Sequence, residues 1–196
     1  MIKRILINGA GSAGARHFEI ARSLFPNAQI AILTNRPILD SNLGYNSHFT
    51  KVEEAIKFQP NIAILAGAAN TRIEIGLALA KSGVHLLVEK PISVSTKSVE
   101  KLIEICAEKN LILALGYNLR FYGSLIYFRD QLNLEVIGKP LLVKCEVGQF
   151  LPSWRESVDY RNSVSAQRKL GGGVLFELSH EIDYLGWIFG KIEWVR

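Results

Sequence analysis

A lysine that ends an apolar strand is the first residue here whose position suggests chemistry. Lys90 follows the run "VHLLV" and Glu89, and it precedes Pro91. The carboxyl ends of buried strands are the edge at which α/β sheets bind their ligands. Pro91 restricts the backbone of the residue before it and can adopt a cis bond. By its position alone, Lys90 also fits the alternative of a solvated lysine at the end of a strand.

A histidine among carboxylates is the second such residue. The sequence "GGGVLFELSHEIDYLGWIFG" predicts a helix over 174–189. At about 100° per residue, one face of that helix is apolar and a separate face is polar. The apolar face groups Leu178, Ile182, Leu185 and Phe189, and the polar face groups Glu177, His180, Glu181 and Tyr184. A histidine flanked by acids suits a general base that an acid orients, and it also fits a capped surface histidine. A zinc ligand is not expected, because H-E-x-x-H is absent and no cysteine or second histidine lies nearby.

A glycine-rich turn near the N-terminus is the third feature. It follows the predicted strand "KRILIN" and opens a predicted helix, which is the context that the G-x-G-x-x-G motif requires. Its members are Gly9, Ala10, Gly11, Ser12, Ala13 and Gly14. The glycines permit a tight turn and the close approach of a pyrophosphate, and the helix N-terminus supplies N–H groups. The alternative is a glycine-rich turn that binds nothing.

The end of the second predicted strand bears on which dinucleotide would bind. A carboxylate is expected there, about 20 residues after the glycines, to hold the ribose hydroxyls. The chain instead has Thr34, Asn35 and Arg36, and no carboxylate until Asp40. A hydroxyl, an amide and a guanidinium would accept a 2′-phosphate that a carboxylate would repel. The sequence therefore favours NADP, with NAD possible, while Arg36 also fits an ordinary exposed loop.

Alternating strands and helices would position these residues. Predicted strands are "KRILIN", "AQIAILT", "NIAILAG", "VHLLVE" and "LILALG", with helices between them over 13–25, 52–58, 71–83 and 95–110. Strands that are apolar on both faces and separated by helices predict a parallel, doubly wound sheet. We therefore expect an α/β dinucleotide-binding domain over 1–120.

The pattern changes after that region. "LVKCEVGQF", residues 142–150, alternates apolar and polar side chains like a strand of an antiparallel sheet, and "KIEWVR" resembles the start of another. We expect a partial second domain of α+β type over 121–196. One strand cannot form a sheet alone, so it would pair with another chain, or the sequence would be a fragment or an inactive relative. A polar loop between them carries Trp154, Arg155, Tyr160, Arg161 and Arg168, which could bind hydroxyls or a phosphate or could be an ordinary exposed loop.

Composition excludes several classes of protein. The chain has 196 residues, 48% of them hydrophobic and 21% charged, which is typical of a globular protein. No apolar run approaches the length of a membrane span, and no signal peptide is expected from the start "MIKRILINGAG". The net charge of +5 is mild, and no basic run with interleaved aromatics suggests nucleic acid. Cys106 and Cys145 are expected to be buried free thiols in a reducing cytoplasm.

These motifs, in this order, resemble those of the Gfo/Idh/MocA oxidoreductases. The set consists of G-x-G-x-x-G, "EKP", "GYNLRF", and "GGG" followed by a helical His-x-x-Asp. The resemblance covers essentially the whole chain. It implies a Rossmann domain followed by an antiparallel α+β domain, with the active site between them.

The resemblance also implies roles for individual residues. Lys90 matches the lysine that contacts nicotinamide and substrate, and His180 matches the catalytic histidine with Glu177 near the family's aspartate. Tyr117, Asn118 and Arg120 match positions that shape the substrate pocket. Cofactor-binding residues would be Gly9, Gly11, Ser12, Ala13, Gly14, Thr34, Asn35, Arg36, Arg72, Glu89 and Lys90. Residues expected at the substrate are Tyr117, Asn118, Arg120, Trp154, Arg155, Tyr160 and Arg161.

The chain departs from the family pattern at four points. Glu177 lies three residues before His180, whereas the family's aspartate lies four before it. Ala68 and Arg72 replace a frequent proline and histidine, and Thr34 replaces the frequent acidic residue. The second domain stops soon after its first predicted helix.

We therefore expect an NAD(P)-dependent oxidoreductase that acts on a secondary alcohol or ketone of a sugar, cyclitol or nucleotide sugar. The alternative is a non-catalytic dinucleotide-binding module, or an inactive relative, that serves assembly or sensing. Expected partners are the small-molecule substrate and further copies of the chain, with no metal, nucleic acid or membrane.

Overall fold

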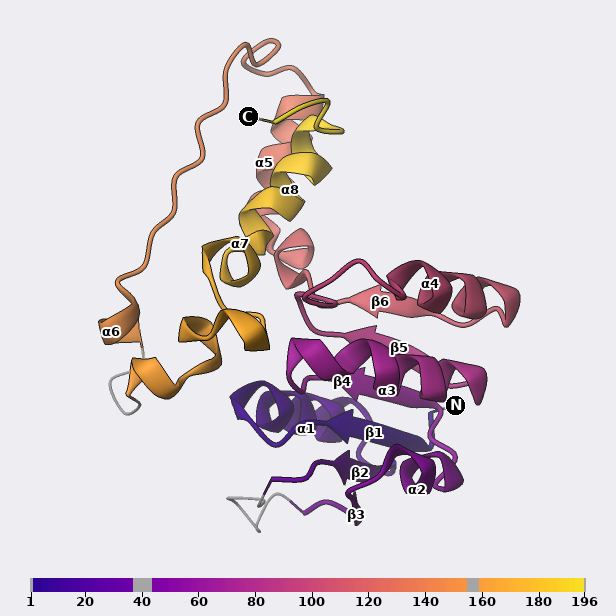
Figure 1. Ribbon diagram of the computed structural model, residues 1–196. Coiled ribbons are helices and arrows are strands. Elements are labelled where there is room, and N and C mark those ends of the chain that lie inside the picture. Colours follow the sequence, from indigo (N-terminus) through magenta and orange to yellow (C-terminus); the bar gives the residue numbers. More distant parts are fainter. Residues whose placement is uncertain (1, 37–43, 155–158, 196) are drawn as a thin grey trace. The chain divides into compact units, whose positions relative to one another are not determined.

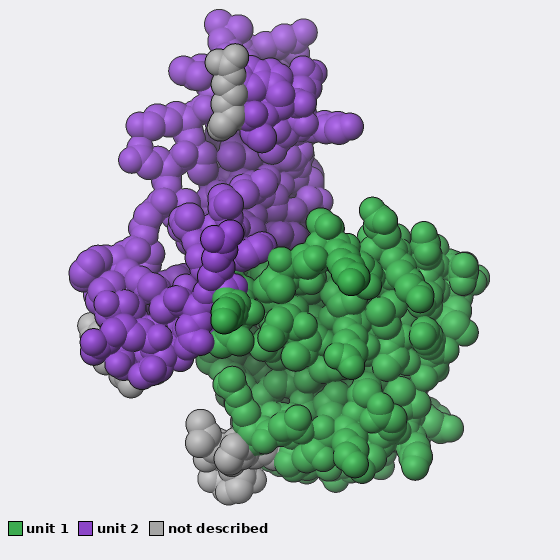
Figure 2. Space-filling model, in the orientation of Figure 1, with its two compact units in different colours: residues 1–116, 169–171 green, residues 117–168, 172–196 purple. Residues whose placement is uncertain are grey.

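A computed structural model of the chain describes residues 2–36, 44–154 and 159–195. These residues form two compact units (Figure 2). The first unit comprises residues 1–116 with 169–171, and the second comprises residues 117–168 with 172–196.

The first unit is built on a six-stranded sheet in which all paired strands are parallel (Figure 1). Its strands are β1 (Arg4–Asn8), β2 (Gln29–Leu33), β3 (Ser47–Phe49), β4 (Ile62–Leu65), β5 (His85–Val88) and β6 (Leu113–Leu115). The order β3-β2-β1-β4-β5-β6 reverses direction at β1, as in a Rossmann sheet, which binds ligands at this switch point. The predicted fold class is confirmed.

Helices cover both faces of this sheet because its strands are apolar on both. The helices are α1 (Ser12–Leu24), α2 (Val52–Lys57), α3 (Ala69–Lys81) and α4 (Val99–Glu108). Ile5, Ile7 and Ile30 pack against Phe18 of α1 on one face. Leu6 and its neighbours pack against α2, α3 and α4 on the other face. The alternation of Ile5, Leu6 and Ile7 between the two clusters is the period-2 geometry of a strand.

The predicted elements of this unit agree with the structure, with one omission. Every predicted strand and helix of the first region is present, while β3 falls in a stretch that the sequence suggested was irregular. Cys106 is a buried free thiol, as expected. The expectation for Cys145 is wrong, because that thiol is free but exposed.

The described residues of the second unit form helices and irregular segments, without a strand. Its elements are η2 (Asn118–Phe121), α5 (Gly123–Asn133), α6 (Leu151–Trp154), η3 (Tyr160–Asn162), η4 (Val164–Ala166), α7 (Val174–Glu177) and α8 (Ser179–Phe189), and η5 (Arg168–Leu170) lies where the chain passes between units. The strand predicted over 142–150 is absent, and so is a strand over 191–195. An alternating segment needs a hydrogen-bonding neighbour to become a strand, and the described residues provide none.

Two further differences concern helices. The sequence did not predict α5, and the helix predicted over 174–189 is interrupted at Leu178, whose backbone leaves the helical region. The apolar face predicted for that helix is also only partly covered, since Ile182 and Phe189 are 48% and 39% exposed.

Candidate functional site

The three glycines of the turn after β1 serve different purposes. Gly9 has a φ of +104°, and a Cβ there would lie 2.8 Å from the Gly67 backbone. A Cβ on Gly14 would overlap the Gly9 carbonyl oxygen. A Cβ on Gly11 would meet no atom of the described residues within 4 Å. Packing within the protein therefore explains Gly9 and Gly14, whereas Gly11 borders open space that a ligand could enter.

The N-terminus of α1 suits an anionic group beside Gly11. Gly11 is its N-cap, no described side chain caps it, and its first turn contains no acidic residue. Exposed Ser12 and half-buried Ala13 begin this turn. A helix N-terminus with uncapped N–H groups and the positive end of its dipole attracts phosphate. These residues fit the pyrophosphate of a dinucleotide.

The residues predicted to bind the ribose lie at the end of β2. Thr34 is buried, and its hydroxyl oxygen accepts a hydrogen bond from the Arg36 amide at 3.1 Å. Its carbonyl accepts one from His48 Nε2 at 2.9 Å. Asn35 and Arg36 are exposed. Thr34 thus shapes the turn that presents the two exposed polar side chains, while Asp40 lies outside the described residues.

Lys90 lies at the same edge of the sheet as the glycine turn. Parallel pairing places Asn8 beside Leu65, and Leu65 beside Val88. The residues that follow β1 and β5 therefore emerge at one edge, as the sequence predicted. Lys90 is half-buried, and its bond to Pro91 is cis.

Glu89 does not point into open solvent, because α1 holds its carboxylate. His17 Nε2 lies 2.8 Å from Glu89 Oε1, and Arg16 Nη2 lies 3.7 Å from the same oxygen. Burial alone would raise the pKa of Glu89, but the hydrogen bond from His17 and the charges of His17, Arg16 and Arg72 hold that pKa below its ordinary value. A carboxylate that stays ionised can only accept hydrogen bonds, so His17 Nε2 is the donor.

Arg72 binds backbone carbonyls around the same loop. It is a buried residue of α3. Its Nε donates to the Gly67 carbonyl at 3.0 Å, and its Nη1 donates to the carbonyls of Glu89, at 2.7 Å, and Pro91. These bonds fix the two loops that flank β4 and β5 at the edge of the sheet. The sequence predicted Arg72 among cofactor-binding residues, and its observed contacts are with this loop.

In the second unit, two contacts connect the "GYNLRF" segment with α8. The rings of Tyr117 and His180 meet edge to face, with their centroids 5.6 Å apart. Arg120 donates two hydrogen bonds to Asp183, at 2.8 and 2.7 Å. The hydrogen bond to Asp183 raises the pKa of Arg120. Asn118 is exposed on η2.

Asp183 is a residue that the sequence analysis did not assign to the site. It is the last residue of the His-x-x-Asp pattern, and that pattern was the available signal. The nearby Tyr184 hydroxyl lies 3.1 Å from Cys145 Sγ. This hydrogen bond, with burial and the charges of Cys145 and Glu181, raises the pKa of Tyr184 to about 12.

Glu177 and His180 lie on different helices. Glu177 ends α7 and His180 is in the first turn of α8, with the backbone break at Leu178 between them. The predicted common face of one continuous helix is therefore not present. The break at Leu178 therefore sets the position of Glu177 relative to the His180 imidazole.

The polar loop of the second unit contains local contacts. Trp154 is the last residue of α6 and Tyr160 begins η3, and both are exposed. Arg161 bonds to Asp159 at 3.0 Å and lies over the Tyr160 ring at 6.0 Å. Arg155 lies outside the described residues.

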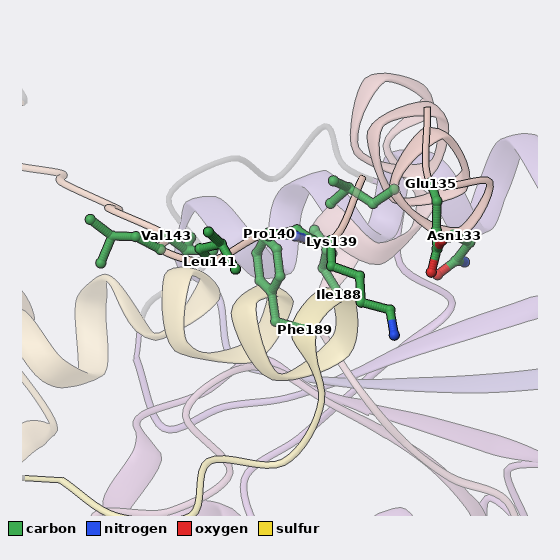
Figure 3. Close-up of a pocket in the computed structure, with 10 residues that line it drawn as sticks. Asn133, Glu135, Lys139, Pro140, Leu141, Val143, Ile188 and Phe189 are labelled. Atoms are coloured by element: carbon green, nitrogen blue, oxygen red, sulfur yellow. The ribbon is translucent and has the colours of Figure 1, made fainter. Parts of the chain in front are cut away.

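A cavity of about 470 Å³ in the second unit includes none of the predicted site residues (Figure 3). It is lined by Leu132, Asn133, Glu135, Lys139, Pro140, Leu141, Leu142, Val143, Ile188 and Phe189. Within the described part of the chain, no group of three His, Cys, Asp or Glu side chains could hold a metal ion. No helix in that part is long and apolar enough to span a membrane.

Comparison with known families gives two matches. Residues 3–117 match GFO_IDH_MocA, described as "Oxidoreductase family, NAD-binding Rossmann fold". Residues 129–196 match GFO_IDH_MocA_C, described as "Oxidoreductase family, C-terminal alpha/beta domain".

Similar individual proteins include two bacterial relatives. The rhizopine catabolism protein MocA of Rhizobium meliloti is 26% identical over 193 residues, which cover 96% of this chain and 57% of that protein. Myo-inositol 2-dehydrogenase of Thermotoga maritima is 25% identical over 195 residues, which cover 96% of this chain and 55% of that protein. The chain thus spans about half the length of these relatives.

Solved structures show the same fold. Myo-inositol 2-dehydrogenase from Lactobacillus plantarum has a TM-score of 0.76 at 20% identity, over 96% of this chain and 56% of that chain. Scyllo-inositol dehydrogenase from Lactobacillus casei, with bound NAD(H) and scyllo-inositol, has a TM-score of 0.64 at 22% identity, over 70% of this chain and 43% of that chain.

Proposed function

The chain belongs to the Gfo/Idh/MocA oxidoreductase family, and we propose that it is a nicotinamide-dinucleotide-dependent oxidoreductase of a polyol or sugar. The observation that carries the proposal is the pairing of two features at one sheet edge. Gly11 borders open space at the uncapped N-terminus of α1, and Lys90 leaves the sheet at the same edge. We expect one dinucleotide to place its pyrophosphate at Gly11 and to reach Lys90 at the same sheet edge.

The substrate class follows from the chemistry of the proposed residues and from the relatives. Three of the similar proteins described above, one relative and two solved structures, are named as inositol dehydrogenases. We therefore expect a secondary alcohol or ketone of a cyclitol, sugar or nucleotide sugar. A bound nicotinamide would supply the acceptor or donor of a hydride.

Each proposed residue has a defined role in that reaction. When the substrate is oxidised, His180 would take the proton of the substrate hydroxyl. The hydride would leave the carbon that bears this hydroxyl. Lys90 would donate a hydrogen bond to the oxygen while negative charge develops on it. Glu177 would orient the imidazole. Tyr117, which contacts the His180 ring, would restrict where that ring lies.

The remaining substrate contacts are part of the same proposal. Exposed Asn118, Trp154 and Tyr160 could meet substrate hydroxyls, as could Arg155. Arg120 and Arg161 are engaged with Asp183 and Asp159 respectively. We expect Arg120 to act mainly through the placement of η2, because both of its hydrogen bonds go to Asp183.

For the cofactor, we propose a preference for NADP over NAD. Arg36 is exposed after β2, beside exposed Asn35, and no carboxylate stands at this strand end in the described residues. A guanidinium can bind a 2′-phosphate with two hydrogen bonds. Thr34 would contribute chiefly by holding the turn through its hydrogen bond from the Arg36 amide.

Self-association is a further part of the proposal. Leu141 and Leu142 of the second unit are 99% and 89% exposed. Apolar surface of this kind is commonly covered by another polypeptide surface. We expect copies of the chain to associate, which light scattering over a range of protein concentrations would detect.

The test of the function is a two-step assay on the chain. Titration with NADP and NAD, followed by intrinsic fluorescence, measures dinucleotide binding. The absorbance of reduced nicotinamide then reports turnover across a panel of inositols, sugars and keto-sugars. Binding with turnover supports the proposal. Tight binding without turnover of any substrate would favour a non-catalytic dinucleotide-binding module instead.

A further inference from the structure

The backbone on both sides of Lys90 is held by the rest of the first unit. The Glu89 amide donates to the Leu65 carbonyl at 3.0 Å, which continues the sheet ladder. The carbonyls of Glu89 and Pro91 both accept from Arg72. The residues on either side of Lys90 are therefore both held by the buried guanidinium of Arg72. These contacts fix the main chain from the α3 side.

The side chain of Glu89 is held from the opposite direction, by α1. His17 and Glu89 are only 15% and 14% exposed at their side chains, and the 2.8 Å hydrogen bond between them is short. Arg16 is farther away, at 3.7 Å, and is 65% exposed, so solvent screens its charge. His17 is consequently the main side-chain partner of Glu89. The bond joins α1 to the residue that immediately precedes Lys90.

We propose that His17 is a positioning residue that couples the dinucleotide-binding end of α1 to Lys90 through Glu89. The inference rests on the proposed function, in which α1 receives the pyrophosphate and Lys90 meets the nicotinamide and substrate. His17 lies about one turn beyond Gly14 on α1. A ligand that fixes the N-terminal turn of α1 would therefore also fix the position of Glu89, through the hydrogen bond from His17. Half-buried Gly116 lies against the other carboxylate oxygen, since a Cβ on Gly116 would lie 3.0 Å from Glu89 Oε2.

The charge state of Glu89 supports this role. The pKa of Glu89 is held below its ordinary value by His17, Arg16 and Arg72, against the effect of burial. An ionised carboxylate accepts a stronger hydrogen bond than a neutral one. The Glu89 carboxylate therefore requires a hydrogen-bond donor at the position of His17 Nε2. A glutamine can place its amide nitrogen there, whereas asparagine is too short.

The test measures the chemical reactivity of Lys90 and needs no turnover. The chain is treated with an amine-reactive acylating reagent, without ligand and with saturating NADP or NAD, and the acylation rate of Lys90 is quantified by mass spectrometry. Exposed Lys101 on α4 serves as the internal reference. In the wild type, bound dinucleotide should protect Lys90 relative to Lys101. In His17→Ala and His17→Asn, at saturation, protection should fall by roughly tenfold or more, as expected for loss of a hydrogen bond to a charged group.

Two variants separate positioning from simple loss of stability. His17→Gln should restore most of the protection, because it restores the donor to Glu89. His85→Ala is the matched control, since His85 accepts a hydrogen bond from the Ile112 amide at the start of β5, the end away from Lys90. It should leave protection unchanged even where it lowers the melting temperature.

Two results would overturn the inference, and they are distinguishable. If Lys90 is protected equally in the wild type, His17→Ala and His17→Asn, His17 has no positioning role while the proposed function stands. If bound dinucleotide fails to protect Lys90 in the wild type, the assignment of Lys90 is wrong and the inference falls with it.

Discussion

Arg120 and Asp183 form a two-point ion pair within the second unit. Nε of Arg120 lies 2.8 Å from Asp183 Oδ2, and Nη2 lies 2.7 Å from Oδ1. The carboxylate is 11% exposed and the guanidinium 43% exposed. The pair joins η2, which follows Tyr117, to α8, which carries His180. It therefore holds the contact between the Tyr117 and His180 rings.

The first prediction concerns the stability that this pair provides. Asp183→Asn should lower the free energy of unfolding by about 1 kcal/mol, because one charge-assisted acceptor is lost from a half-exposed pair. Urea unfolding measures the change. Asp159→Asn is the control, since the exposed Asp159–Arg161 pair should contribute less. A double-mutant cycle with Arg120→Gln that gives no coupling would contradict the prediction.

The second prediction separates the glycines of the turn. Gly11→Ala should leave the free energy of unfolding within about 0.5 kcal/mol but weaken dinucleotide binding about tenfold or more. The reason is that its Cβ would enter space that no atom of the described chain occupies. Gly14→Ala should destabilise the fold by about 1–3 kcal/mol, because its Cβ overlaps the Gly9 carbonyl. Thermal melts and fluorescence titrations measure both effects. Unchanged affinity in Gly11→Ala would argue against a pyrophosphate at this turn.

The third prediction concerns the choice of dinucleotide. NADP should bind more tightly than NAD by about 1–3 kcal/mol if Arg36 makes one charge-assisted contact with the 2′-phosphate. Arg36→Ala should remove most of that difference by weakening NADP alone. Arg22→Ala is a control, since Arg22 bonds to carbonyls at the far end of α1. Equal affinities in the wild type would refute the preference.

The fourth prediction is the pH dependence that Glu89 confers. Its folded pKa is below the ordinary value of 4.5, so the folded state binds this proton less readily than the unfolded state does. The stabilisation is thus complete above the ordinary pKa and is lost as the pH falls through the folded pKa. The stability difference between wild type and Glu89→Gln should stay level between about pH 5 and pH 6 and shrink below about pH 4. Urea unfolding across this range measures it, and a difference that grows on acidification would contradict the sign.

The sheet could be predicted from the sequence because its signal is local. Runs such as Ile5–Ile7 are apolar on both faces and are bounded by glycine or proline, so composition and length identify them. β3 was missed because three residues, Ser47–Phe49, carry no period. The segment over 142–150 has the pattern of a strand, but a strand also needs a partner, and pattern says nothing about whether one is present.

The site shows the same division between local and distant signals. The glycine turn and the loop at Lys90 were located from short motifs next to strands. The bond between His17 and Glu89 joins residues 72 positions apart, and no spacing along the chain indicates it. Arg72 was expected at the cofactor from its position after β4, but the spacing did not indicate its hydrogen bonds to three backbone carbonyls. The break at Leu178 was missed because helical periodicity continues across it.

The last prediction concerns the proposed catalytic residues. Lys90→Ala and His180→Ala should each lower turnover by about two to four orders of magnitude, the range for loss of a general acid–base or charge-stabilising group. Both should still bind the dinucleotide, because neither residue belongs to the glycine turn that is proposed to hold the pyrophosphate. Glu177→Gln should do less damage, since Glu177 ends α7 and would only orient the imidazole of His180, which lies on α8. The pH profile of turnover should show a group near the reference value for histidine, about 6.5, that disappears in His180→Ala. If His180→Ala turns over substrate as fast as the wild type, another residue is the base.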